Sequence, residues 1–295
     1  MKIDRIFYSN SVPLPATIEV PDTFANPGVK FPAVILCHGH SRHKNDGLDV
    51  LAENLLEEEI VTIRFDFRGC GEGAANRYHL YCASEWSDDL QNALSFAQSL
   101  PYVDDRRMGV AGISMGAATA VYVSGIDDRI RSAVSMGGIS DCEAWLKGVW
   151  ERSGGSWQEF LEVVKEDSIV SAATGMSKVV NVLEMYNSTS QERAGAVCEA
   201  CTDKDVNCYL TLDSLMNLLK YKPIEKCQYI HNPIFFIHGE DDVLVPPMES
   251  QIMYEKVPTR EKRIKLYKGV DHNIPRAAGR EAVFKDIVGW FKDSL

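Results

Sequence analysis

A serine flanked by two glycines is the residue of this sequence with the clearest chemical potential. Residues 112–116 read Gly-Ile-Ser-Met-Gly and lie between an apolar run and an alanine-rich run. A serine at the apex of a strand-to-helix turn has strained backbone angles, and small residues two positions away on each side avoid clashes with the neighbouring elements. Ser135 and Ser140 each lack one of the two glycines. We therefore predict that Ser114 is a nucleophile; the alternative is a glycine-rich structural turn.

The hydroxyl of a serine becomes a good nucleophile only when a base removes its proton, and the base needs an orienting acid. Residues 233–237 are a short apolar strand candidate, and His-Gly-Glu-Asp-Asp follows directly. We predict that Asp242 is the acid, because it ends a Gly-x-x-Asp turn just before a Val-Pro pair that opens the next helix. Glu240 and Asp241 compete with it, and Asp241 is the stronger alternative.

The predicted base is His272. It follows residues 263–267, which alternate like a strand, so one strand-helix-strand step separates it from Asp242. Such a step brings both residues to the same edge of a parallel sheet. All the other histidines precede Asp242 in the chain, so only His272 completes the order Ser, Asp, His.

Several matched blocks give the chain a clear resemblance to the α/β-hydrolases. Residues 31–40 resemble the third strand and oxyanion loop of that superfamily, 61–73 its fourth strand with an Arg-Gly-x-Gly turn, and 87–90 the opening of the helix before the nucleophile strand. Within the superfamily the chain is most similar to cinnamoyl (feruloyl) esterases and to acylaminoacyl-peptidase-like hydrolases. It departs from them at His40, where an apolar or aromatic residue is common, and at Cys70, where histidine is common.

The resemblance implies a fold, a mechanism and a substrate class. The fold would be a mostly parallel eight-stranded sheet with helices on both faces and a helical cap inserted after strand 6. Ser114, His272 and Asp242 would form an acyl-enzyme on a carboxylic ester of a small to medium apolar or aromatic acid. The backbone N–H groups of Met115 and His40 would form the oxyanion hole. No metal or organic cofactor is needed for this chemistry.

Other activities fit the same residues. One triad can also cleave amides or short peptides, thioesters, or a carbon–carbon bond in a diketone. A protein of another class, one that binds a ligand without catalysis, is less favoured because such proteins usually lose a member of the triad. A dehalogenase or an epoxide hydrolase is disfavoured too, since both commonly have an aspartate where this chain has Ser114.

The remaining pattern indicates the elements that must position these residues. Alternation and apolar runs predict strands, and helical spacing predicts helices between them. The expected strands are 3–12, 16–20, 33–37, 61–67, 108–113 and 132–136, and the expected helices are 46–58, 87–100, 115–124, 247–256 and 277–293. This alternation is typical of a parallel sheet covered on both faces.

Residues 140–232 break that rhythm. They have no strand-like alternation, and we expect helices at 157–165, 178–186 and 214–221, with glycine breakers between them. The expected division is therefore a core of residues 1–139 and 233–295 with a cap of residues 140–232. An insertion after the sixth strand lies at the carboxyl edge of the sheet, so the cap should cover Ser114. Most of its aromatic residues should hold the cap together, and a minority should line an acyl pocket.

Composition is consistent with an intracellular enzyme. The net charge of −11 and the pI of about 5.2 disfavour a nucleic-acid partner. No apolar run has the length of a signal peptide or a membrane span, so we expect a soluble, cytoplasmic protein with a small-molecule ester or amide substrate and no membrane partner. The sequence leaves open whether the chain is a homodimer.

The eight cysteines are expected to be free, mostly buried thiols. Cys198, Cys201, Cys208 and Cys227 could instead bind zinc as four thiolates, but only the first two are closely spaced, and a zinc site usually has a second close pair. We therefore predict no metal site. His38, just before the oxyanion loop, is expected to have a structural role.

Overall fold

The computed structural model describes residues 1–295 apart from 26–27, 41, 75–82, 153 and 182–208. Its centre is an eight-stranded sheet with the order β1-β2-β4-β3-β5-β6-β9-β10. The strands are β1 (Lys2–Ser9), β2 (Val12–Glu19), β3 (Phe31–Cys37), β4 (Val61–Phe65), β5 (Val103–Ile113), β6 (Ile130–Met136), β9 (Ile234–Gly239) and β10 (Lys262–Tyr267). β2 pairs antiparallel with β1 and β4, and all the other neighbours are parallel. The prediction of a mostly parallel eight-stranded sheet is confirmed.

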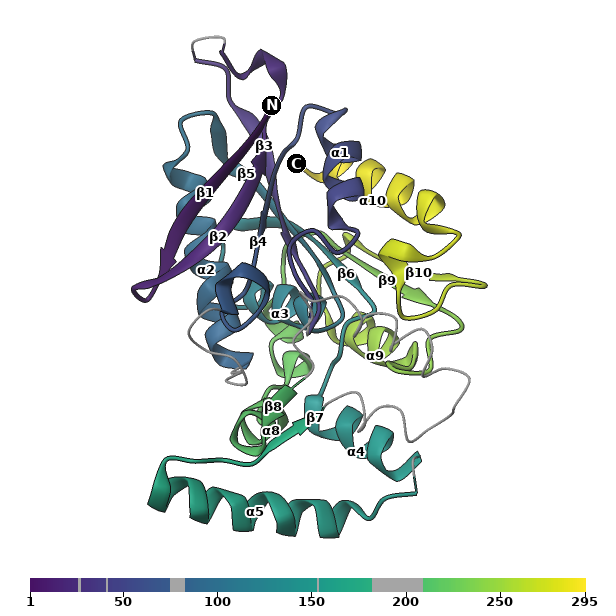
Figure 1. Ribbon diagram of the computed structural model, residues 1–295. Helices are drawn as coiled ribbons and strands as arrows, with labels where there is room; N and C mark the ends of the chain where they lie inside the picture. The colour runs from purple at the N-terminus through teal and green to yellow at the C-terminus, as the bar shows by residue number, and fades with distance from the viewer. Residues whose placement is uncertain (26–27, 41, 75–82, 153, 182–208) are drawn as a thin grey trace.

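Helices cover both faces of this sheet (Figure 1). α1 (Leu48–Leu56) and α10 (Arg280–Ser294) pack with one set of strand side chains, and α2 (Ala83–Ser99), α3 (Met115–Ser124) and α9 (Met248–Lys256) pack with the other. In β3, Val34 and Leu36 belong to the first core while Ala33, Ile35 and Cys37 belong to the second. A strand buried on both sides needs apolar residues at successive positions, which explains its continuous apolar sequence.

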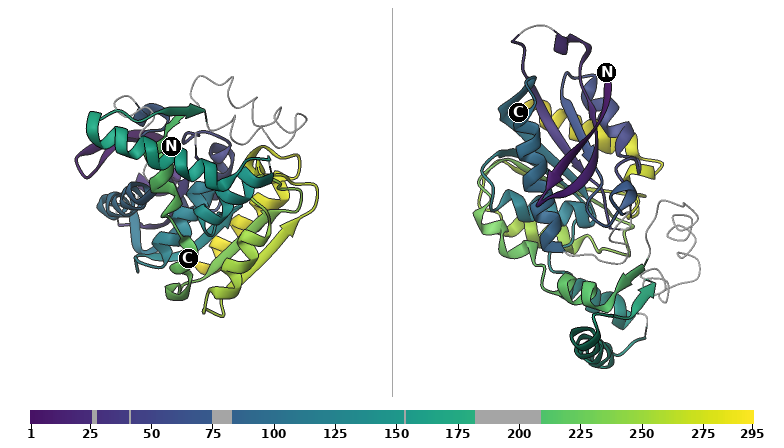
Figure 2. Two further views of the ribbon diagram at one scale, coloured as in Figure 1. Left: turned by 90° about the horizontal axis from the view of Figure 1, so that it is seen from below. Right: turned by 60° about the vertical axis from the view of Figure 1, so that its left-hand side comes forward.

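The insertion after β6 gathers at one end of the molecule. It contains α4 (Cys142–Arg152), α5 (Trp157–Thr174), β7 (Val179–Asn181), β8 (Tyr209–Thr211) and α8 (Leu212–Leu219). Both figures show these elements beyond the end of the sheet that lies opposite the two chain termini (Figures 1 and 2). Two backbone hydrogen bonds join the start of the insertion to its end. They run from Cys142 N–H to the Tyr221 carbonyl (3.1 Å) and from Ile224 N–H to the Ser140 carbonyl (2.9 Å).

Two expectations for the insertion are wrong. β7 and β8 form a small antiparallel sheet, whereas the sequence predicted no strand there. The helix expected at 178–186 is contradicted by β7, where β-branched valines pair with β8; residues 182–186 lie outside the described part of the chain. The helix expected at 157–165 is real but continues to Thr174, because no breaker occurs before Gly175, which ends it with a φ of 73°.

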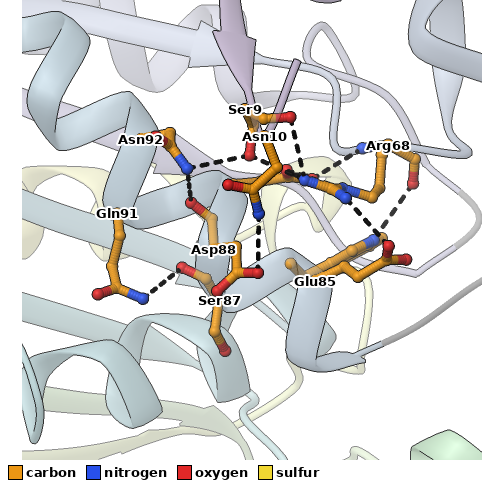
Figure 3. A network of polar contacts seen from close by, with 10 residues as sticks. Ser9, Asn10, Arg68, Glu85, Ser87, Asp88, Gln91 and Asn92 are labelled. Atoms are coloured by element: carbon orange, nitrogen blue, oxygen red, sulfur yellow. Dashed lines mark hydrogen bonds and ion pairs between the residues drawn. The ribbon is translucent and has the colours of Figure 1, made fainter. Parts of the chain in front are cut away.

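A buried arginine fixes the turn that follows β4. The Arg68 guanidinium donates to Asp89 (Nε, 2.9 Å), Glu85 (Nη1, 3.0 Å) and the Ser9 hydroxyl (Nη2, 2.8 Å). Figure 3 shows Arg68 between Ser9 at the end of β1 and Glu85 at the start of α2. The turn after β4 therefore has a fixed position, and the loop after β3, which carries His40, packs beside it.

Candidate active site

Ser114 occupies the turn between β5 and α3. Its φ of 54° and ψ of −118° lie in a region that residues other than glycine rarely adopt. Its N–H donates to the Met136 carbonyl of β6 (2.9 Å), which holds the turn against the neighbouring strand. The side chain is partly exposed at the carboxyl edge of the sheet. This is the strained strand-to-helix geometry that the Gly-x-Ser-x-Gly pattern predicts.

The two flanking glycines allow backbone to approach the turn closely. A Cβ added at Gly112 would lie 2.2 Å from the Gly116 carbonyl oxygen, and one added at Gly116 would lie 2.3 Å from the His38 carbonyl oxygen. Both clashes are with backbone, which cannot move aside as a flexible side chain can. The pattern therefore follows from packing of β5, α3 and the end of β3.

Alanine at either glycine should destabilise the fold. We expect Gly112→Ala and Gly116→Ala each to lower the free energy of unfolding by about 1–3 kcal/mol, because each methyl group would overpack the elbow, the turn that carries Ser114. Gly289→Ala is the matched control: nothing lies within 4 Å of a Cβ there, and in α10 alanine should gain about 1 kcal/mol. Thermal unfolding followed by circular dichroism measures all three. Wild-type midpoints in both elbow variants would contradict the packing described above.

The structure brings Ser114, His272 and Asp242 together in one hydrogen-bonded chain. His272 Nε2 lies 2.9 Å from Ser114 Oγ, and His272 Nδ1 lies 2.6 Å from Asp242 Oδ2. The three residues follow the carboxyl ends of β5, β9 and β10, which end at the same edge because β5, β6, β9 and β10 are parallel neighbours. The competing acids Glu240 and Asp241 are exposed, and neither contacts His272.

Asp242 is buried and accepts hydrogen bonds on both oxygens. Oδ1 accepts from the N–H groups of Leu244 (3.0 Å) and Val245 (2.8 Å), and Oδ2 accepts from His272. Burial alone would raise the pKa of Asp242, but the charge of His272 and the hydrogen bonds from His238 and His272 hold this pKa well below its ordinary value. The carboxylate is therefore ionised at neutral pH and can stabilise an imidazolium at His272.

The predicted oxyanion donors lie on either side of Ser114. Met115 is the first residue of α3, and the first N–H groups of a helix have no acceptor within it. A Cβ added at Gly39 would lie 3.3 Å from Ser114 Cβ, so the backbone leading into His40 runs against the serine. Burial, with a smaller effect of His38, lowers the pKa of His40 to about 4, so its imidazole is neutral at pH 7.

His38 supports the oxyanion loop from behind, as predicted. Its Nδ1–H donates to the Gly39 carbonyl (2.7 Å), and its Nε2 accepts from the Phe67 N–H (3.1 Å). The ring packs edge-on against Phe67 and Trp86. His38 therefore joins the oxyanion loop to the turn after β4.

Ion pairs hold the rest of the loop between β3 and α1, which carries His40. The Lys44 ammonium contacts Asp66 (3.3 Å) and Glu72 (3.0 Å). Asp46 pairs with Arg42 (3.2 Å) and with Arg276, which follows His272 in the chain. The loop that carries His40 and the loop that carries the base are thus joined through one shared carboxylate.

The sequence analysis missed two contacts of the acid turn, which is the turn after β9 that carries Asp242. His238 is fully buried beside Asp242, and the Trp145 indole N–H of α4 donates to the Leu244 carbonyl (2.8 Å). The spacing of His238 and Asp242, four residues apart across a tight turn after a strand, was a usable signal. No local pattern points to Trp145.

Three of the described cysteines are poorly reactive thiols. Cys37, Cys142 and Cys227 are free and buried, and burial raises the pKa of each, that of Cys227 to about 12. Cys198, Cys201 and Cys208 of the alternative zinc site lie outside the described residues. In the part of the chain that the structure describes, no group of three or more histidine, cysteine or acidic side chains could hold a metal, and no helix is long and apolar enough to cross a membrane.

Comparisons with known proteins agree with the fold. The family model described as serine aminopeptidase, S33, matches residues 30–276. An uncharacterized 31.7 kDa protein of Escherichia coli, from the traX-finO intergenic region, is 27% identical over 299 residues, with 100% of both chains covered. The polyketide transferase claH of Penicillium crustosum is 25% identical, over 83% of this chain and 82% of its own. The solved structure of Est1E from Butyrivibrio proteoclasticus superposes with a TM-score of 0.71 and 15% identity, over 99% of this chain and 98% of its own.

Proposed function

Because the chain belongs to the serine aminopeptidase S33 family of α/β-hydrolases, we propose that it is a serine hydrolase that cleaves a carboxylic ester through an acyl-enzyme. The hydrogen-bonded chain from Ser114 through His272 to Asp242 carries this proposal, with separations of 2.9 and 2.6 Å. Nucleophile, base and orienting acid have the contacts that acyl transfer requires.

The first half-reaction forms the acyl-enzyme. His272 Nε2 takes the proton of the Ser114 hydroxyl while Oγ attacks the ester carbonyl carbon. Negative charge develops on the carbonyl oxygen, where the N–H groups of Met115 and His40 hold it. The intermediate collapses as the bond to the leaving oxygen breaks, and His272 gives its proton to that oxygen. The alcohol leaves, and the acyl group stays on Ser114.

The second half-reaction releases the acid. A water molecule gives a proton to His272 and attacks the acyl carbon, and the same donors hold the new oxyanion. The bond to Ser114 Oγ then breaks, and the proton returns from His272 to Oγ. Asp242 stays ionised throughout and stabilises the imidazolium each time it forms. The cycle balances without a metal or an organic cofactor.

We propose an apolar or aromatic acid of small to medium size as the acyl group. The described insertion is rich in apolar side chains at the edge of the sheet that carries Ser114, which supports this choice. Est1E, the structural neighbour of the same fold, has also been solved with ferulic acid bound. Cys37, Cys142 and Cys227 are free thiols, which favours a reducing compartment such as the cytoplasm.

Residues 140–232 act as a cap in this proposal. Trp145 of α4 donates to Leu244 in the acid turn (2.8 Å), and the Ser140 N–H and hydroxyl both donate to Glu249 at the start of α9. The base of the insertion is therefore anchored beside Asp242. Trp150 holds α4 and α5 together, because its indole N–H donates to the Ser156 carbonyl and its ring packs against Phe160.

A second candidate reaction is acyl transfer from a thioester. The relative claH is named a polyketide transferase, and an acyl-enzyme can pass its acyl group to an alcohol instead of water. The family description, serine aminopeptidase, keeps amide cleavage as a third candidate. Leaving group and acceptor decide among them, so substrates that differ only in these groups separate the reactions.

A matched substrate panel tests the function. One aromatic and one aliphatic acyl group are each presented as an ester, a thioester, an amide and a β-diketone, with and without added alcohol. We expect ester turnover to exceed amide turnover by at least about 100-fold in kcat/KM, and an ester of a soluble polymer to be a poor substrate because the cap excludes it. Faster thioester than ester cleavage, or transfer to the alcohol, would favour the second candidate. Ligand binding without turnover of any member would contradict a hydrolase.

A further inference from the structure

His238 is a buried histidine in contact with the triad that the mechanism above does not use. It lies on β9, and its side chain has no exposed surface. Its Nε2 lies 2.8 Å from the Val245 carbonyl and 3.2 Å from Asp242 Oδ2, and its Nδ1 lies 2.7 Å from the Ser250 hydroxyl. A polar ring without access to solvent requires partners on both nitrogens, and this one has them.

The partners fix which nitrogen carries the proton. A backbone carbonyl and an ionised carboxylate can only accept hydrogen bonds, so Nε2 must carry the hydrogen that both of them share. Ser250 can donate its hydroxyl hydrogen to Nδ1, which leaves the ring neutral with its hydrogen on Nε2. Glu249, the acid next to Ser250, is bonded to Ser140. Asp242 is therefore the charged group in contact with His238.

We propose that His238 is a positioning residue that fixes the carboxylate of Asp242, and that Ser250 sets the tautomer of His238 for this task. The proposal rests on the proposed function, because it assigns His238 a part in the same triad. His238 acts at two points of one turn: its Nε2–H reaches Asp242 Oδ2 and the carbonyl of Val245, whose own N–H donates to Asp242 Oδ1. The carboxylate cannot rotate without breaking one of these contacts.

This arrangement has a kinetic consequence. The correct angle of Asp242 matters most when His272 becomes an imidazolium, so its loss should lower kcat more than it raises KM.

Three variants test the proposal. His238→Leu removes the donor, His238→Gln keeps an N–H on a side chain of similar reach, and Ser250→Ala removes the group that sets the tautomer. We expect His238→Leu to lose about 10- to 100-fold in kcat with a KM change below about 3-fold. His238→Gln should regain most of the loss. Ser250→Ala should lower kcat by a smaller factor, again with little change in KM.

Two controls separate the possible failures. His231→Leu changes an exposed histidine just before β9 and should leave kcat and KM unchanged. Absence of ester turnover in the wild type would overturn the proposed function itself. Wild-type turnover together with an unchanged kcat in a folded His238→Leu variant would overturn only the positioning role. Should His238→Leu fail to fold, the kcat of Ser250→Ala decides, and a wild-type kcat there overturns the proposal.

Discussion

Replacing Ser114 with alanine should lower kcat/KM for an ester by about 10⁴- to 10⁶-fold, because no other group can form the acyl-enzyme. The fold should survive. Ser114 is partly exposed, and its hydroxyl contacts His272 rather than the apolar core. The unusual φ of 54° should cost alanine about as much as it costs serine, because the strain comes from the Cβ atom that both residues have. The measurement is steady-state turnover, with circular dichroism to verify folding.

A fluorophosphonate probe gives the same test without a substrate. It should label the wild-type protein at Ser114, and Ser114→Ala should not react. Ser135→Ala is the matched control: Ser135 Oγ is buried without a hydrogen-bond partner, so its removal should change neither labelling nor turnover. Labelling at another residue, or ester turnover in Ser114→Ala above a tenth of the wild-type value, would refute Ser114 as the nucleophile.

The triad could be predicted because each member lies in a short pattern with its own physical cause. The glycines around Ser114 are required because a Cβ added at either would lie 2.2 or 2.3 Å from a backbone oxygen, so the local sequence reflects the packing of the fold. Asp242 and His272 each follow an apolar or alternating strand, and parallel pairing then brings them to one edge. Asp242 is favoured over Asp241 by the turn, in which the N–H groups of Leu244 and Val245 reach its carboxylate.

The missed features depend on partners that are distant in the chain. β7 is only three residues long and exists because it pairs with β8, which lies some thirty residues further on. Trp145 of α4 contacts Leu244 in the acid turn although the two residues are 99 positions apart in the chain. The sequence around each of these segments resembles an ordinary amphipathic helix or a loop. Local periodicity has no information about such a partner, so these elements could not be predicted from one sequence.

Asp242→Asn should lower kcat by about 10⁴-fold while leaving the protein folded. An asparagine can offer its NH₂ group to His272 Nδ1, where Asp242 Oδ2 now accepts a hydrogen bond at 2.6 Å. The imidazole would then carry its hydrogen on Nε2, facing Ser114 Oγ, and could not take the serine proton. The neutral amide would also fail to stabilise the imidazolium. Both defects act in the chemical step, so KM should change little.

Asp241→Asn and Glu240→Gln are matched controls for this loss. They remove the same kind of charge from neighbouring residues of the same turn, but both side chains are exposed and neither contacts His272. Each should retain kcat within about 2-fold of the wild type, since exposed charges at this distance are largely screened by solvent. A large loss in Asp241→Asn, with near-wild-type turnover in Asp242→Asn, would move the triad acid to Asp241. Equal and small effects in all three variants would mean that the hydrogen bond between Asp242 and His272 does not orient the base during turnover.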